Sequence, residues 1–186
     1  MRRAIAVSPQ FVPAYQALGG VLFNQSRIAE ALEVFRAGRQ HDPERFDLES
    51  AELFTLNFCD DISSDALFAK HRAFGARVEK AYSPRFEPFQ NIKDPERRLR
   101  IGYLSGDFNH HPVTFFLLPL LERHDRSEYE IYCYSVGTKV DEITRQAQKE
   151  ADVWREVMSL SETKLADTIN RDRIDILVDL AGHSGE

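Results

Sequence analysis

The chain has 186 residues, 42% of them hydrophobic and 29% charged, a composition typical of a soluble globular protein with one compact domain or two small ones. The formal net charge of −6 offers no field for nucleic acid or an anionic membrane, and the apolar stretch Phe115–Leu121 is too short to span a bilayer. The two cysteines form no CxxC pair, which argues against a disulfide scaffold or a structural zinc site and favours a cytoplasmic location.

A helical repeat opens the chain. Ser8-Pro9 and Asp42-Pro43 are matching helix-ending dipeptides 34 residues apart, which is the period of the tetratricopeptide repeat. Apolar residues at helical spacing predict one helix over residues 12–24 and a second over 28–41. Gly19 and Ala31 are small, so we expect the two helix backbones to approach closely. The predicted inner faces consist of Ala14, Tyr15, Leu18, Val21 and Leu22 on the first helix and Ile28, Ala31, Leu32 and Phe35 on the second.

Counting back from Pro9 by the same template places Met1 and Ala4 in the second helix of a preceding repeat. The chain is therefore expected to begin inside a helix. Because a single repeat cannot bury both faces of its helices, we expect a fragment of a longer array, or a repeat that packs on the next segment of the chain. Residues 1–45 are predicted to hold the end of one repeat and one full repeat.

Residues 46–96 are predicted to close the repeat array and connect it to the next domain. Apolar spacing favours helices over residues 47–58 and 64–81, with Phe68 and His71 on the apolar side of the second helix. We expect His71 to be a packed histidine rather than a ligand. Three prolines and mixed charge over residues 83–96 are typical of a linker.

Residues 97–186 alternate short apolar runs with helical patterns, which predicts a doubly wound parallel sheet. The basic residues Arg97, Arg98 and Arg100 are interpreted as a solvated flank where this part begins. Pro112 suits the first turn of a helix. That helix is expected to have an apolar side made of Val113, Phe116, Leu117, Leu120 and Leu121. The predicted strands cover residues 99–105, 130–136, 153–157 and 175–181, and the predicted helices cover 112–121, 140–151 and 161–171.

Two loops combine glycine with histidine at the predicted carboxyl ends of strands, where ligands bind in such sheets. One runs over residues 105–112, with the letters SGDFNHHP, and the other is Gly182-His183-Ser184-Gly185. No G-x-G-x-x-G or Walker A pattern comes after the first strand, which makes a dinucleotide or P-loop site a weak hypothesis.

The segments RLRIGYLSGDFNHHPVTFFLLPLLERHDRSEYEIYCYS and RDRIDILVDLAGHSGE closely resemble the catalytic region of the O-linked N-acetylglucosamine transferase and SPINDLY family, and the helices with ELFTLNF and HRAFG resemble its bridge to the repeats. The D-L-A-G-H form is typical of bacterial members. The resemblance implies a Rossmann-like sheet that forms an incomplete first lobe of a GT-B glycosyltransferase. It implies metal-free transfer of a sugar from a nucleotide donor to serine or threonine of proteins that the repeats guide to the cleft. UDP-N-acetylglucosamine is the expected donor, held mainly by a second lobe absent from this chain, so the chain alone is expected to be inactive.

The family's active-site histidine maps onto His111, as a base or as a group that positions its neighbours, and His110 is a second, weaker candidate. A neutral imidazole at a helix start could accept a proton from a hydroxyl nucleophile, and the helix N-terminus could favour phosphate oxygens of the donor. Asp107 is expected to fix the loop by accepting backbone N–H bonds. The residues expected to line the substrate cleft are His183, Gly182, Asp107, Pro112 and Thr114.

Two other interpretations stay open at this point. One is a repeat-based interaction module whose α/β part has lost its chemistry. The other is an enzyme of the same family with a different donor, such as GDP-fucose, which the SPINDLY branch uses. Protein partners are expected in every case, whereas nucleic acid, membrane and metal are not.

Overall fold

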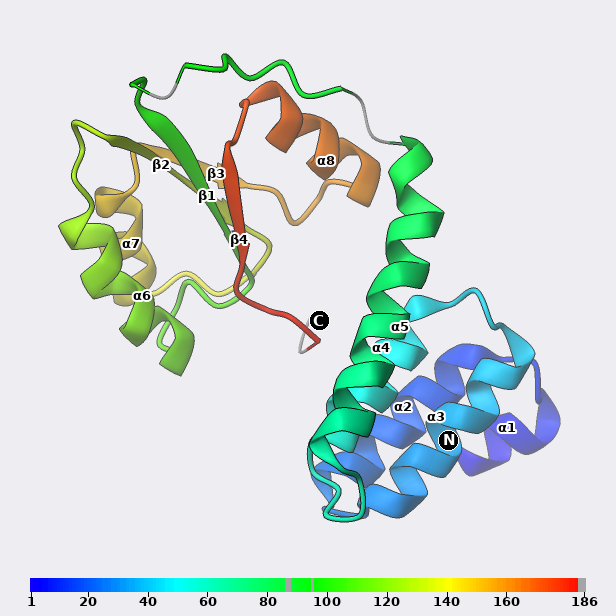
Figure 1. Cartoon of the computed structure of the whole chain (residues 1–186). Coiled ribbons are helices and arrows are strands. Elements are labelled where there is room, and N and C mark those ends of the chain that lie inside the picture. The colour runs from blue at the N-terminus through cyan, green and yellow to red at the C-terminus, as the bar shows by residue number, and fades with distance from the viewer. Residues whose placement is uncertain (86–87, 95, 184–186) are drawn as a thin grey trace. The chain divides into compact units, whose positions relative to one another are not determined.

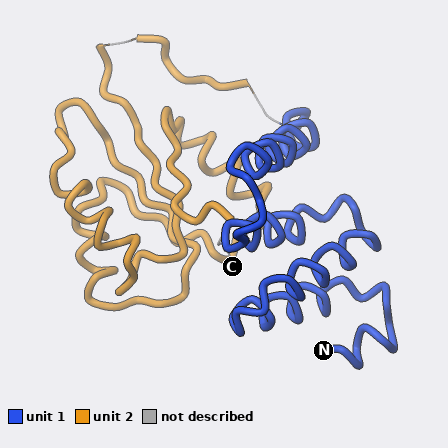
Figure 2. The backbone as a smooth tube through the Cα atoms, turned by 60° about the horizontal axis from the view of Figure 1, so that its bottom comes forward, with its two compact units in different colours: residues 1–86 blue, residues 87–186 orange. Residues whose placement is uncertain are grey.

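The computed structural model describes residues 1–85, 88–94 and 96–183. They belong to two compact units, residues 1–86 and residues 87–186 (Figure 2). The first unit is helical: α1 (Arg2–Val7), α2 (Val12–Asn24), α3 (Ile28–His41), α4 (Phe46–Leu56), α5 (Ser64–Tyr82) and the 3-10 turn Ser83–Arg85 (Figure 1). The second is α/β: β1 (Leu99–Ser105), α6 (Pro112–Arg123), β2 (Tyr129–Ser135), α7 (Glu142–Glu150), β3 (Val153–Glu156), α8 (Glu162–Arg171) and β4 (Ile176–Asp179).

Helices followed by a parallel Rossmann-like sheet confirm the predicted fold class. The finer division into repeat, capping helices and linker at residues 45 and 96 stays a prediction. None of the helices in the described ranges is both long enough and apolar enough to span a lipid bilayer.

The α2–α3 pair has the predicted bounds and packs around two glycines. A Cβ on Gly19 would lie 2.3 Å from a ring carbon of Phe35, and one on Gly38 would lie 2.7 Å from the Cβ of Tyr15. Gly19 therefore makes room for the aromatic ring of Phe35. The buried cluster that these helices form with α4 consists of Val12, Leu22, Ala31, Phe35 and Leu48.

Three positions in this unit differ from the predicted burial. Val21 is 39% exposed, because it lies about 100° around α2 from the buried Leu22. Phe68 is 63% exposed, and no residue of α5 is fully buried, so His71 is half-buried rather than packed in a core. A broad apolar pattern on an amphipathic helix thus overestimated how much of each helix is covered.

The four strands of the second unit are all parallel and lie in the order β3-β2-β1-β4. Helices α6 and α7 cover one face and α8 covers the other (Figure 1). Because successive side chains of a strand point to opposite faces, Ile131 and Cys133 join the first core while Tyr132 and Tyr134 join the second. The sheet is therefore doubly wound, as predicted, although β4 is shorter than expected.

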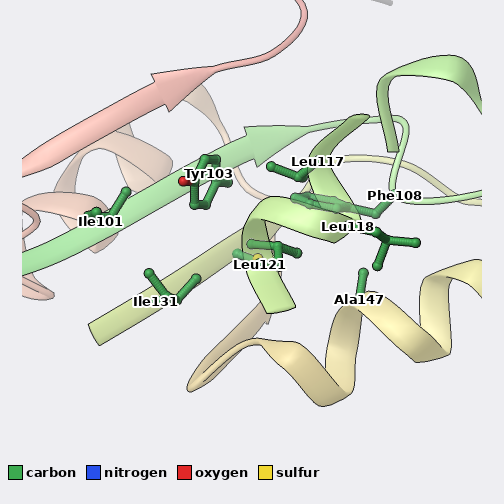
Figure 3. Packing of buried hydrophobic residues seen from close by; sticks show 9 residues of the cluster. Ile101, Tyr103, Phe108, Leu117, Leu118, Leu121, Ile131 and Ala147 are labelled. Carbon is green, nitrogen blue, oxygen red and sulfur yellow. The ribbon is translucent and has the colours of Figure 1, made fainter. Parts of the chain in front are cut away.

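The core under α6 and α7 contains the predicted Leu117 and Leu121 and shows why the rest of the predicted face of α6 was wrong (Figure 3). Phe116 and Leu120 were expected inside, yet they are 85% and 47% exposed. Helix α6 is apolar on nearly every side, so its composition does not select a face. The sheet does, and it buries positions at the i, i+3, i+4, i+7 spacing of one helical stripe: Thr114, Leu117, Leu118 and Leu121.

Two of the three arginines, Arg97 before β1 and Arg100 within it, are not the predicted solvated flank. Arg97 donates to Asp175 at 2.7 Å, and Arg100 donates to Glu130 at 2.8 Å. Arg98 is the most exposed of the three, although its Nε donates to the Tyr129 carbonyl at 3.0 Å and its guanidinium lies 3.5 Å from Asp152. The Arg97 guanidinium holds the pKa of the Asp175 carboxyl well below its usual range. These ion pairs fasten the start of β1 to its two neighbouring strands.

Candidate functional site

The loops that carry the predicted histidines leave the sheet at one edge. Ser105 at the end of β1 pairs with Ser135 at the end of β2, and Leu104 pairs with Asp179 at the end of β4. The chain runs outward from β1 to β2 and β3 and then returns to the other side of β1. The gap between β1 and β4 is therefore a topological switch point, where parallel sheets bind their ligands.

The loop after β1 is held by hydrogen bonds between the main chain of Asp107 and two side-chain hydroxyls. The N–H of Asp107 donates to the buried Ser105 hydroxyl at 3.0 Å, and the hydroxyl of Thr114 donates to the Asp107 carbonyl. Phe108 anchors the loop from below, with its ring 4.9 Å from the ring of Trp154. Asp107 thus fixes the loop through its main chain, whereas the prediction had its carboxylate accepting N–H bonds.

His111 is the N-cap of α6. Its backbone is extended, and Pro112 occupies the first helical position, where a fixed φ suits the helix. The ring Nδ1 accepts the Val113 N–H at 3.3 Å and lies 3.7 Å from the carboxylate of Asp107. The His111 and Asp107 side chains are each 41% exposed. The ring of His111 is therefore held on its Nδ1 side and open to solvent.

This capping bond decides what the His111 ring can do. A neutral imidazole whose Nδ1 accepts a hydrogen bond carries its proton on Nε2, so Nε2–H is a donor. Such a donor beside a helix N-terminus suits a negatively charged oxygen. Acting as a base at Nε2 would require a proton on Nδ1, and the Asp107 carboxylate at 3.7 Å lies beyond hydrogen-bond distance of that atom. The geometry favours hydrogen-bond donation.

His110 makes two contacts, one through its main chain and one through its ring. Its N–H donates to the carboxylate of Asp141 at 2.8 Å, and its ring packs edge-on against Phe115 at 5.0 Å between centroids. Asp141 belongs to the loop after β2 and caps α7, a contact that sequence analysis missed. A signal was present, because Asp141 stands three residues before Thr144 in a capping-box pattern.

The loop after β4 is a tight turn around Asp179. Its carboxylate accepts the Ala181 N–H at 2.9 Å and the Gly182 N–H at 3.3 Å. Gly182 has φ of +56°, a left-handed conformation that favours glycine. The half-buried His183 comes next, whereas Ser184 and Gly185 of the predicted loop lie outside the described residues.

The remaining predicted cleft residues are placed differently from one another. Pro112 is exposed at the start of α6, but Thr114 is 1% exposed with its hydroxyl on the loop carbonyl, so it holds the loop rather than reaching a ligand. Within the part of the chain that the structure describes, no three His, Cys, Asp or Glu side chains are grouped to hold a metal ion.

The comparison with protein families matches residues 59–185 to the model of glycosyl transferase family 41. The chain belongs to that family. The match begins in the helical unit and covers the whole sheet, including both loops at the switch point.

Two plant proteins are similar in sequence to this chain. The chain is 35% identical over 147 residues to a probable UDP-N-acetylglucosamine–peptide N-acetylglucosaminyltransferase SPINDLY of Arabidopsis thaliana, covering 77% of this chain and 16% of that protein. It is 36% identical over 89 residues to the protein SEC of the same plant, named with the same activity, covering 47% of this chain and 9% of that protein.

A solved structure shares the fold. A mutant of Thermobaculum terrenum O-GlcNAc transferase superposes with a TM-score of 0.87 at 33% identity, over 99% of this chain and 35% of that chain. The chain thus spans about one sixth of the SPINDLY relative and about one third of this solved chain.

Proposed function

We propose that this chain forms part of a protein O-glycosyltransferase, which transfers a sugar from a nucleotide-sugar donor to serine or threonine of proteins. The observation that carries the proposal is His111, which caps α6 next to the switch point of a family 41 sheet. The relatives are named for transfer of N-acetylglucosamine from UDP to peptides, which supports UDP-N-acetylglucosamine as the donor.

In the proposed step, the acceptor hydroxyl oxygen attacks the anomeric carbon of the sugar. The bond from that carbon to the diphosphate oxygen breaks, the nucleoside diphosphate leaves with the electron pair, and the hydroxyl proton is released. Negative charge develops on the departing phosphate oxygens. Nε2–H of His111 and the N-terminus of α6 supply a hydrogen-bond donor and a positive dipole end for such an oxygen.

The other predicted residues take supporting roles in this proposal. Asp107 and Thr114 hold the His111 loop, while Gly182 and His183 border the other side of the switch point. The groups that hold most of the nucleotide are proposed to lie in a second lobe beyond these residues, so this chain alone has no transferase activity. The helical unit guides acceptor proteins, and the enzyme works in the cytoplasm.

The test is donor turnover by the full-length protein that contains this chain, with UDP-N-acetylglucosamine, UDP-glucose and GDP-fucose offered separately. Wild type is compared with His111→Asn, because an asparagine side chain still caps α6 but lacks Nε2–H. We expect release of one nucleotide, dependent on acceptor protein, and a fall of about 100-fold in kcat for the variant, typical of losing one preorganised donor. Turnover of no donor, with protein partners still captured, would replace the proposal with an interaction module.

A further inference from the structure

We infer that Asp141 is a positioning residue that ties the His111 loop to the N-terminus of α7. The inference rests on the proposed function for its effect on turnover, but the contacts themselves are independent of it. Asp141 lies in the loop after β2, 30 residues from His111 in sequence. Neither the predicted site nor the relatives' names point to it.

The carboxylate of Asp141 has two separate tasks, one for each oxygen. Oδ2 accepts the N–H of His110 at 2.8 Å, and Oδ1 accepts the N–H of Thr144 at 2.9 Å. The Asp141 N–H in turn donates to the Thr144 hydroxyl at 3.0 Å, which completes a capping box. The Asp141 side chain therefore caps α7 and also forms a hydrogen bond with the loop after β1.

The loops after β1 and β2 are also in backbone contact next to the Asp141–His110 hydrogen bond. The Val136 N–H donates to the Ser105 carbonyl at 3.0 Å. A Cβ on Gly137 would lie 2.1 Å from the carbonyl oxygen of Gly106, so only glycine fits there without a shift of the backbone. The loop after β2 therefore lies directly against the loop after β1, and α7 is the rigid element behind it.

The hydrogen bond to Asp141 holds His110, the residue next to His111. With the His110 N–H held by Asp141 and its ring held against Phe115, the main chain that enters α6 is fixed from both sides. The His111 N–H also donates to the Asn109 carbonyl at 2.6 Å. These contacts hold the main chain at His111, and the Val113 N–H holds its ring. Hydrogen bonds from the Thr144 and His110 N–H groups lower the pKa of Asp141, because both bonds favour the ionised carboxylate.

Two substitutions separate the tasks of Asp141. Asp141→Asn keeps one oxygen for the Thr144 N–H, and asparagine is as good an N-cap as aspartate. Its amide nitrogen replaces the second oxygen and cannot accept the His110 N–H. Thr144→Val is the matched control, because it removes the hydroxyl of the capping box, keeps the side-chain shape and leaves the bond from Asp141 to His110 intact.

The first readout uses the 186-residue chain and needs no activity. We expect Asp141→Asn to speed hydrogen exchange of the His110 amide by about tenfold or more and to shift the ring nitrogen resonances of His111, with the thermal midpoint near that of wild type. Thr144→Val should lower the midpoint and change neither signal. Unchanged signals in Asp141→Asn, or equal changes in both variants, would refute the positioning role.

The second readout is turnover by the full-length protein. Asp141→Asn should lower kcat about tenfold with little change in KM for the donor, because misplacement of a reacting group is felt in the transition state. Thr144→Val should turn over donor like wild type, and equal losses in both variants would count against the inference. If the wild-type protein turns over no donor, the proposed function fails, and the exchange and resonance data still decide whether Asp141 holds the loop.

Discussion

At the scale of the residue, the imidazole of His111 combines a structural bond with a free donor. Nδ1 is used by the Val113 N–H, and Nε2 takes no hydrogen bond from any residue that the structure describes. The capping bond thus selects which nitrogen carries the proton of a neutral ring. A mutation that removes the cap at His111 therefore changes stability as well as chemistry, and the two effects have to be separated.

We predict that His111→Ala lowers the free energy of unfolding by about 0.5–1 kcal/mol, the low end of the range for a lost N-cap, because the capping bond is long at 3.3 Å. His111→Asn should unfold close to wild type. Urea denaturation of the two variants checks this. Equal stability of His111→Ala and wild type would mean that the capping bond contributes nothing.

His124 is a second histidine with a consequence that can be measured. Its Nε2 lies 2.7 Å from the Tyr103 hydroxyl, and burial, assisted by the Arg126 charge, lowers the pKa of His124. As pH falls, His124 is protonated in the unfolded chain before it is protonated in the folded chain. Neutral His124 therefore contributes its full stabilisation of the fold above pH of about 6.5, and this contribution is lost as pH falls through the lower pKa of the folded state. Thermal midpoints of wild type and His124→Gln between pH of about 8 and 5 should converge toward acid pH, and parallel curves would contradict this.

At the scale of the element, packing of the helical unit depends on a glycine. Gly38→Ala would place a methyl group 2.7 Å from the Cβ of Tyr15 and 2.9 Å from Leu48, so we predict a loss of about 1–3 kcal/mol from overpacking. Gly20→Ala is the matched control, since a Cβ there meets nothing within 4 Å and alanine favours the helix by up to ~1 kcal/mol. Urea unfolding followed by helical circular dichroism should separate the two variants in sign, and destabilisation by both would show that helix propensity does not act as expected.

At the scale of the whole molecule, the strand order creates the candidate site. Because β3 and β4 lie on opposite sides of the β1–β2 pair, the chain must cross the sheet after β3, and the crossing opens the switch point next to β1. The two faces are covered by different helices, so the sheet has a separate core on each side. Both loops that carry the predicted histidines end at that point, although residues about 70 positions apart supply them.

Several features of this protein can be read from local order along the chain. The bounds of α2, α3 and β1 follow from spacing and helix-ending dipeptides, and Pro112 marks the start of α6, since these signals lie within a few residues of each other. The predicted place of His111 at a strand end also rests on such signals.

Other features were decided only by tertiary structure, because they depend on partners far away in sequence. Phe116 and Leu117 of α6 are both apolar, and only packing against the sheet determines that Leu117 is buried and Phe116 is exposed. Arg97 pairs with Asp175, the residue just before the neighbouring strand β4, instead of facing solvent. Asp141 reads as an ordinary helix cap until the fold brings His110 to its second oxygen, and only the packing of two loops could supply that contact.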